Sequence, residues 1–486
     1  MKLDSQTKNS GILTYWKPFL YWVFAAAITV GISYLLVVQT TIAIIVFGAS
    51  ITTLLVRKNY IWGLCGILFL PVIGELLRLP FGGENGMLIS DLAIAILGVI
   101  WGYEKIIARK TSPSTQKTFS SPLIVFCLLA ALSLLFSLTF LSPVEVMSGS
   151  LYLIRFIEYS LLGVMTVSVI KTENDRKRLL NTMIISALVI AIAGFIQLNI
   201  YPDLGKIAEY GWDPHINRLV STWLDPNFIA GFLSFILAIV GSITLHTKEI
   251  RKKMWLGGII MLLVIAIFLT YSRSGYVAAG IVLFTIGILK SRELLITSII
   301  LIIVGMGVLP RAQERVNNLI HSAQSLIFNT SENPDATARL RIISWQQTFE
   351  LIEKRPLLGS GYNTLKYVKY NEGFVNDPSV HSASGSDSSF LTILATTGIL
   401  GFIPYILIYW NVLKLSIKNW RNKKNAPLWQ GYSLGIFAGT LGLIGHSFFV
   451  NSLLFPQILI FFWISIGLLK SIVEQQEELQ GEKSLP

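Results

Sequence analysis

Long apolar runs recur along almost the whole chain, and they constrain its fold more than any other feature of the sequence. Each run is about 17 to 25 residues long, the length that an α-helix needs to cross the roughly 30 Å hydrocarbon core of a bilayer. Of the 486 residues, 53% are hydrophobic and only 14% are charged. A soluble protein of this size could not cover its surface with so few charges. The sequence therefore predicts an all-α, polytopic helical membrane protein.

About fourteen runs qualify as transmembrane helices. They lie at 19–37, 40–56, 60–76, 87–102, 122–141, 151–170, 179–200, 224–245, 254–271, 274–289, 294–310, 387–413, 429–448 and 453–469. Both cysteines lie inside such runs and say nothing about redox compartment or metals. The polar N-terminus lacks a small-residue cleavage site and precedes a full-length run, so we expect no removable signal peptide.

The net charge of +12 at pH 7 is a topology signal. With the N-terminus inside, most of the 39 Lys and Arg fall in cytoplasmic segments such as "KTENDRKR" and "KNWRNKK". Short loops rich in Lys and Arg stay on the cytoplasmic side of a membrane. The sequence therefore predicts that both termini are cytoplasmic, and the basic charge indicates no nucleic-acid partner.

Most connections are short, so residues 1–486 are predicted to form a single membrane domain. The main exception is the extracytoplasmic loop 311–386, and loops of that length are usually functional or structured. Its apolar residues predict two short amphipathic helices, one at 313–328 and one at about 337–354 that stops before Pro356. The segment "PLLGSGYN" that follows is a glycine-punctuated turn.

Three arginines on the predicted outer side are the most informative polar residues. Arg218 precedes a span, Arg273 lies in a hairpin of about two residues between two spans, and Arg341 lies near the start of the second loop helix. Guanidinium groups pair bidentately with phosphate oxygens, so together they would make a diphosphate site. A single arginine in such a position, taken alone, is most often an anchor for lipid headgroups.

Four further residues are candidates for a supporting role. Asp225 and Asn227 stand at the start of a span, where they either support the site or simply cap the helix. Arg155 and Glu158 are three residues apart on one face of a predicted span and are expected to pair. Such an intramembrane pair is either functional or a structural ion pair. Asp91, in another span, is either a buried contact or part of a cavity lining.

The island "VHSASGSDSSF" at 380–390 is the densest polar cluster before a membrane-length run. His381 and Asp387 are its only titratable side chains, and either is a candidate general base for a hydroxyl group. The alternative is a linker that ends in a helix cap. The sequence has no ligand spacing for a metal, no phosphate-binding glycine loop and no Gly-x-Ser-x-Gly elbow. Metal chemistry and nucleotide hydrolysis are therefore not expected, and no cofactor is predicted.

Four segments, in this order, resemble the O-antigen ligase and O-antigen polymerase (Wzy-type) superfamily of bacterial membrane glycosyltransferases. They are "STWLDPNFIAGFL" (221–233), "FLTYSRSGYVAAG" (268–280), "RIISWQQTFELIEKRPLLGSGYNTL" (341–365) and "SDSSFLTILATTGILGF" (386–402). The third and fourth are the most specific. The resemblance covers roughly residues 200–410, and the N-terminal spans match only in being apolar.

The resemblance implies a reaction, a fold and a location. Such enzymes are similar to other lipid-dependent glycosyltransferases of the GT-C class and are thought to need no metal. They transfer a glycan from undecaprenyl diphosphate at the outer face of the bacterial cytoplasmic membrane. The acceptor is another lipid-linked repeat in polymerases and lipid A-core in ligases. In that case Arg218 and Arg273 hold the departing diphosphate and Arg341 assists or positions the loop. Membrane lipids and, for a polymerase, a chain-length regulator protein are further expected partners.

One difference from the ligases favours a polymerase. Ligases carry a His-Asn pair where this chain has Asp387-Ser388, and the Asp variant resembles polymerases. The base stays open between Asp387 and His381, or neither acts and diphosphate departure carries the catalysis. A flippase or transporter of lipid-linked oligosaccharides is the alternative from another class. It is disfavoured because the chain shows no internal repeat and concentrates its polarity in one loop.

Overall fold

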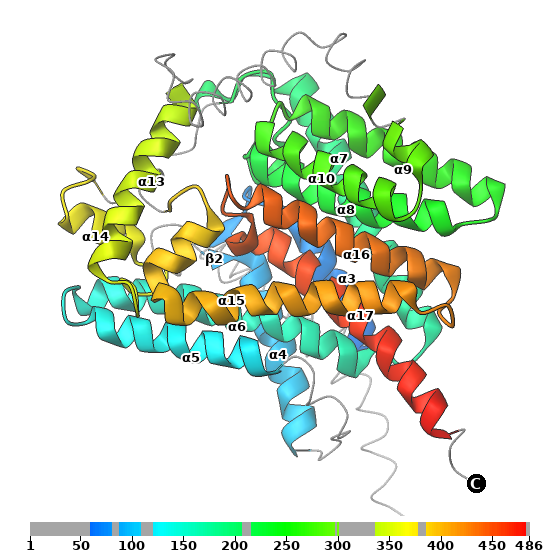
Figure 1. Ribbon diagram of the computed structural model, residues 1–486, viewed down its shortest axis with the longest axis horizontal. Helices are drawn as coiled ribbons and strands as arrows, with labels where there is room; N and C mark the ends of the chain where they lie inside the picture. The colour runs from blue at the N-terminus through cyan, green and yellow to red at the C-terminus, as the bar shows by residue number, and fades with distance from the viewer. Residues whose placement is uncertain are drawn as a thin grey trace, which may run out of the picture.

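The computed structural model describes residues 59–79, 87–107, 120–206, 215–296, 299–300, 336–377 and 385–482. These residues form an all-helical bundle with one small hairpin (Figure 1). The helices are α3 (Tyr60–Phe69), α4 (Ile89–Ile107), α5 (Ser120–Ser137), α6 (Pro143–Val169), α7 (Glu173–Ile200), α8 (Pro226–His246), α9 (Ile250–Leu269), α10 (Arg273–Leu289), α13 (Ala336–Lys354), α14 (Leu365–Asn371), α15 (Ser389–Arg421), α16 (Pro427–His446) and α17 (Pro456–Glu482). Three short 3₁₀ helices are η1 (Leu70–Val72), η4 (Ser221–Trp223) and η6 (Ser452–Leu454). Strands β1 (Arg78–Leu79) and β2 (Met87–Leu88) pair antiparallel, with Arg78 opposite Leu88.

Six of the described helices are long and apolar enough to cross a membrane. They are Pro143–Val169, Glu173–Ile200, Pro226–His246, Ile250–Leu269, Ser389–Arg421 and the first part of α17, Pro456–Val473. Four shorter apolar helical segments accompany them in the described part of the chain. The prediction of an all-α integral membrane protein is therefore confirmed. The predicted spans 19–37 and 40–56, nearly all of 294–310 and the loop helix 313–328 lie outside the described residues, so the number fourteen stays a prediction.

Helix α8 is the centre of the bundle. Most of its residues are buried around its whole circumference, and it packs against α9, α10 and α16. Glycines four residues apart on α16 permit the closest of these contacts. A Cβ at Gly431 would lie 2.8 Å from the Cα of Ile243, and one at Gly435 would lie 2.5 Å from the Cα of Ile239. Small residues at this spacing allow membrane helices to approach backbone to backbone.

Helix α15 is broken in its N-terminal third at Gly398, which has φ 62° and ψ −174°. The break removes intrahelical partners from the backbone groups on either side of it. The glycine turn 356–361 supplies replacements. Ser360 N donates to the Ala395 carbonyl (3.0 Å), and Gly361 N donates to the Thr396 carbonyl (2.9 Å). In return, Ile399 N donates to the Pro356 carbonyl (2.8 Å). The turn and the helix break are therefore one structural unit.

The predicted helix boundaries hold best where a strong local signal ends the apolar run. Helix α13 matches the predicted 337–354, and the hairpin between α9 and α10 is as short as expected. Helix α6, however, begins at Pro143 and not at 151. Ser142 and Glu145 form a reciprocal capping box with proline at the first helical position. This pattern is visible in the sequence but lies before the apolar run begins.

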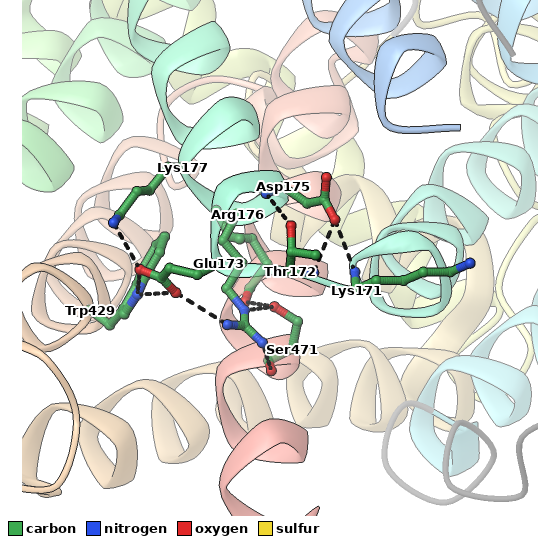
Figure 2. Close-up of polar contacts among 9 residues, drawn as sticks. Lys171, Thr172, Glu173, Asp175, Arg176, Lys177, Trp429 and Ser471 are labelled. Carbon is green, nitrogen blue, oxygen red and sulfur yellow. Dashed lines mark hydrogen bonds and ion pairs between the residues drawn. The ribbon is translucent and has the colours of Figure 1, made fainter. Parts of the chain in front are cut away.

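The opposite end of the bundle, away from α13 and α14, is tied together at the start of α7 (Figure 2). Arg176 is only 4% exposed, and its guanidinium donates to the Ser471 carbonyl of α17 (3.1 Å). Glu173 accepts from Arg176 (3.3 Å) and from the indole nitrogen of Trp429 in α16 (2.9 Å). The start of α7 therefore connects three helices, and its basic side chains pair with its own two carboxylates.

Candidate functional site

The starts of α8 and α10 lie side by side and carry the first group of predicted residues. Asp225 caps α8 and accepts from the backbone nitrogens of Asn227 (2.6 Å) and Phe228 (3.2 Å). Ser272 caps α10 and donates to Asn227 Oδ1 (2.7 Å). The cap interpretation of Asp225 is therefore confirmed, and Asn227 links two helix starts.

Arg218 and Arg273 are brought to the same short turn. Arg218 Nε donates to the Thr270 carbonyl (2.8 Å), which holds this side chain against the α9–α10 connection. Arg273 is the first residue of α10, three residues further along the chain. Gln197 of α7 supports the segment from below, because its side-chain carbonyl accepts from Val220 N (2.9 Å). Two arginine residues and two helix N-termini thus lie at one end of the bundle, where an anion is favoured.

Backbone strain is concentrated in the same segments. Within the described ranges, six non-glycine residues have positive φ, and five of them belong to segments at this end: Asn217, Ser221, Leu224, Tyr271 and Asp387, with φ between 49° and 56°. A left-handed conformation costs an ordinary residue about 1 to 3 kcal/mol and persists only where the surroundings impose it. Such clusters are typical of functional sites.

The serine-rich island enters α15 at the same end. Asp387 is exposed and immediately precedes Ser388, which caps the helix by accepting from Leu391 N (3.4 Å). Ser389 N donates to the Ser447 carbonyl (2.9 Å), so the island is anchored on the turn after α16. His381 lies outside the described residues. The serines described here cap and anchor, whereas Asp387 is exposed and within electrostatic range of Lys369.

Lys369 was not predicted, yet it holds this island in place. The side chain is 1% exposed, and its ammonium donates to the Gly385 carbonyl (2.8 Å) and to Ser344 Oγ (3.1 Å). Burial lowers the pKa of Lys369 to about 8, and the Asp387 carboxylate acts in the opposite direction. Lys369 therefore connects α13, α14 and the segment that carries Asp387.

Arg341 lies in a group of buried polar atoms that the described residues leave without hydrogen-bond partners. The group contains Arg341 Nε, Trp345 Nε1, His446 Nε2 and Ser447 Oγ. Arg341 is within electrostatic range of His446, and the Trp345 ring faces that of Phe449 at 6.3 Å between centroids. Buried polar atoms are nearly always paired in native proteins. Two of the four atoms belong to α13, and the other two belong to the end of α16 and the residue that follows it.

His446 is the second residue that the sequence did not indicate. It ends α16, is fully buried, and its Nδ1 lies 2.7 Å from Ser452 Oγ. This contact orients the ring, whose surroundings also include the backbone of Asn227 at the start of α8. A Cβ at Gly231 of α8 would lie 2.9 Å from the imidazole. A lone His in an apolar run forms no motif, because its neighbours come from α8, α13 and η6.

The predicted pair of Arg155 and Glu158 is wrong. Arg155 pairs with Asp91 of α4 (2.7 Å), whose other oxygen accepts from the Tyr159 hydroxyl (2.5 Å). Glu158 Oε1 is buried without a partner among the described residues. The i,i+3 spacing on one helix permitted the pair, but a carboxylate on the neighbouring helix offered the guanidinium a direct contact. Asp91 is therefore a buried contact between α4 and α6.

Together the fold and the site define a class: a polytopic helical membrane protein with an arginine-rich polar site at one end of the bundle. Figure 1 shows α13 and α14 beyond the end at which α15 begins. Residues 258–406 match the family model described as O-antigen ligase. This match confirms the resemblance to the O-antigen ligase and polymerase superfamily, and it spans the α9–α10 connection, α13, the glycine turn and the kink of α15. No curated protein matches the chain.

Proposed function

We propose that the protein is a polysaccharide polymerase of the O-antigen, capsule or exopolysaccharide type. In this proposal it transfers a glycan from undecaprenyl diphosphate to another lipid-linked repeat at the outer face of the cytoplasmic membrane. The family match supports a membrane glycosyltransferase-like enzyme with lipid-linked glycan substrates. The choice of a polymerase rests on Asp387-Ser388. The ligases that this chain resembles carry a His-Asn pair at these two positions.

The observation that carries the proposal is the meeting of cations and helix starts around Arg218 and Arg273. The Arg218 guanidinium is fixed on the Thr270 carbonyl (2.8 Å), beside the first residue of α10. Fixed cations are suited to the diphosphate of a lipid-linked donor, because its charge increases as it leaves. Asp387 takes the proton of the acceptor hydroxyl, the oxygen forms a bond to the anomeric carbon, and the bond from that carbon to the diphosphate oxygen breaks.

The first test changes the arginines. Arg218→Ala and Arg273→Ala are expected to lower polymer formation from purified lipid-linked repeat by about 10² to 10³, the usual effect of removing one transition-state contact. Arg341→Ala is also expected to lower polymer formation. Arg339→Ala is the matched control, because Arg339 is exposed on the same helix and should retain activity. Wild-type chain lengths in both Arg218→Ala and Arg273→Ala would remove the diphosphate assignment.

The second test concerns the base. Asp387→Asn keeps the shape of the side chain and removes its basicity, so turnover is expected to fall by about 10² to 10⁴. His381→Ala is made in parallel. If turnover survives in the Asp387 variant and falls in the His381 variant, the roles are reversed. If it survives in both, this island provides no general base.

The alternative is a ligase, which the description of the matching family model favours. The two activities differ in the acceptor. A polymerase lengthens the lipid-linked chain when the repeat is the only glycan supplied. A ligase leaves the repeat unextended and transfers it to lipid A-core or another added acceptor. Chromatography of the products from both incubations separates the two functions.

A further inference from the structure

A cavity lies at the other end of the bundle, between α5, α15 and α17. Its volume is about 340 Å³, and three lysines line it: Lys414 and Lys418 of α15 and Lys470 of α17. Ile408, Val412 and Trp463 also line it, and they precede the lysines on the same two helices. The cavity is therefore basic toward the helix ends and apolar toward the middle of the bundle.

The position of the cavity fits the headgroup level of a membrane. The part of helix α15 that follows the break at Gly398, residues 399–421, is about 35 Å long and exceeds the roughly 30 Å hydrocarbon core. Its last turn therefore extends into the interface. Lys414 lies over the ring of Trp410 (5.2 Å), and Trp410 is 51% exposed. Exposed tryptophans of membrane proteins are concentrated at this level.

The residues that line this cavity differ in charge from those around Arg176 at the same end of the bundle. Lys470 precedes Ser471, the residue that Arg176 contacts in Figure 2, so the two features are neighbours. Around Arg176 the basic side chains are paired with Glu173 and Asp175. Among the described residues that line the cavity, by contrast, there is no carboxylate. The exposed Lys414 and Lys418 therefore face no carboxylate in the described lining, and these two ammonium groups can bind an anion.

We propose that this cavity binds one anionic phospholipid from the leaflet that the positive-inside rule assigns to the cytoplasm. The lysines bind the phosphate, and an acyl chain lies along the apolar wall. The wall distinguishes a lipid from a free phosphate, because a free phosphate would gain nothing from Val412 or Trp463. Basic pockets between membrane helices on this side are known to suit anionic headgroups. The site is independent of the polar end of the bundle and of the proposed reaction.

Native mass spectrometry of the full-length detergent-purified protein tests the proposal, with phosphatidylglycerol and phosphatidylcholine as probes. The wild type is expected to retain one phosphatidylglycerol and to prefer it to phosphatidylcholine. The variant Lys414→Gln/Lys418→Gln changes only exposed side chains and leaves the buried Lys470. Its affinity for phosphatidylglycerol is expected to fall about 25-fold, since each lysine near an anionic headgroup contributes about fivefold.

The control variant Lys423→Gln/Lys424→Gln removes the same charge from exposed positions in the next loop and should bind as the wild type does. A second variant, Asn411→Glu, adds a carboxylate to the cavity and should also weaken binding. Equal losses in the cavity and control variants would overturn the proposal. So would equal retention of the two lipids, or displacement by millimolar inorganic phosphate. Binding that requires Glu474→Gln, Glu477→Gln and Glu478→Gln would mean that the acidic tail occupies the cavity, and the proposal would fail.

Discussion

Lys369 is the single residue whose chemistry most directly affects the predicted base. It is buried between α13 and the 385–388 segment and has its pKa lowered to about 8 by desolvation. The protonated form donates the hydrogen bonds to Gly385 and Ser344. Because the folded-state pKa lies below the usual 10.5, the charged form carries a cost at neutral pH that disappears as pH rises from about 8 to 10.5. As pH rises through this range, the free energy of unfolding is therefore expected to increase, while the hydrogen bonds from Lys369 to Gly385 and Ser344 are expected to weaken.

This leads to a prediction for the pH profile of turnover. Activity is expected to fall as pH rises through about 8, since deprotonation removes positive charge beside Asp387 and weakens the anchor at Gly385. In Lys369→Arg the side chain stays charged above pH 12, so the alkaline fall should move upward. Lys369→Met should be less active with no fall near pH 8. An unchanged profile in Lys369→Arg would show that another group titrates.

Sequence reasoning failed at the residue scale wherever a side chain finds its partner on another helix. Arg218 and Arg273 were identified because they stand next to recognisable breaks between apolar runs. His446 and Lys369 could not be, since each acquires its surroundings only when separate helices pack. The same reason explains why the sequence predicted Glu158, and not Asp91, as the partner of Arg155.

At the scale of elements, the kink of α15 is stabilised by the turn 356–361. A Cβ at Gly398 would lie 2.1 Å from the Leu357 carbonyl oxygen, and its φ of 62° is unfavourable for other residues. Gly359 has the reciprocal problem, because its Cβ would lie 2.5 Å from the Thr396 carbonyl carbon. The sequence predicted the turn and the span separately. It could not show that each satisfies the other's backbone, because the segments are some thirty-five residues apart.

Gly398→Ala is therefore expected to destabilise the protein by about 3 kcal/mol or more through backbone strain and overlap. The measurement is thermal unfolding in detergent. Gly257→Ala provides the control, because nothing lies within 4 Å of a Cβ at that position of α9, and its melting temperature should stay the same or rise slightly. Similar melting temperatures for the two variants would mean that the loop yields to the added methyl group.

At the scale of the whole molecule, hydropathy predicted the helical class and, within a few residues, the boundaries of α8, α9 and α10. It did not predict which polar contacts join the helices. The polar connections run between distant segments, as from Arg176 to Ser471 and from Arg155 to Asp91. Polar side chains within an apolar bundle are few, and each one acts over a long sequence separation. Their pairing follows from the packing and not from any local pattern.

The Asp91–Arg155 ion pair gives a prediction about how much such a contact between helices stabilises the protein. Arg155→Met leaves the Asp91 carboxylate, 7% exposed, with the Tyr159 hydroxyl but without a counter-charge. A loss of about 3 kcal/mol is expected. Asp91→Asn/Arg155→Met should cost less than the sum of the two single changes. Lys252→Ala breaks an exposed pair with Glu249 and should cost less than about 1 kcal/mol. Additive single losses would show that the two groups do not depend on each other.

The backbone hydrogen bonds that interlock the 356–361 turn with the broken part of α15 also limit how proteins of this kind can be recombined. A chimera that exchanges residues 311–386 alone would join a turn from one parent to a broken helix from another. The donated turn would then face carbonyls and a backbone path that it did not evolve with. Exchange is expected to yield folded protein when the crossover lies beyond residue 400, so that both halves of the interlock are inherited from the same parent.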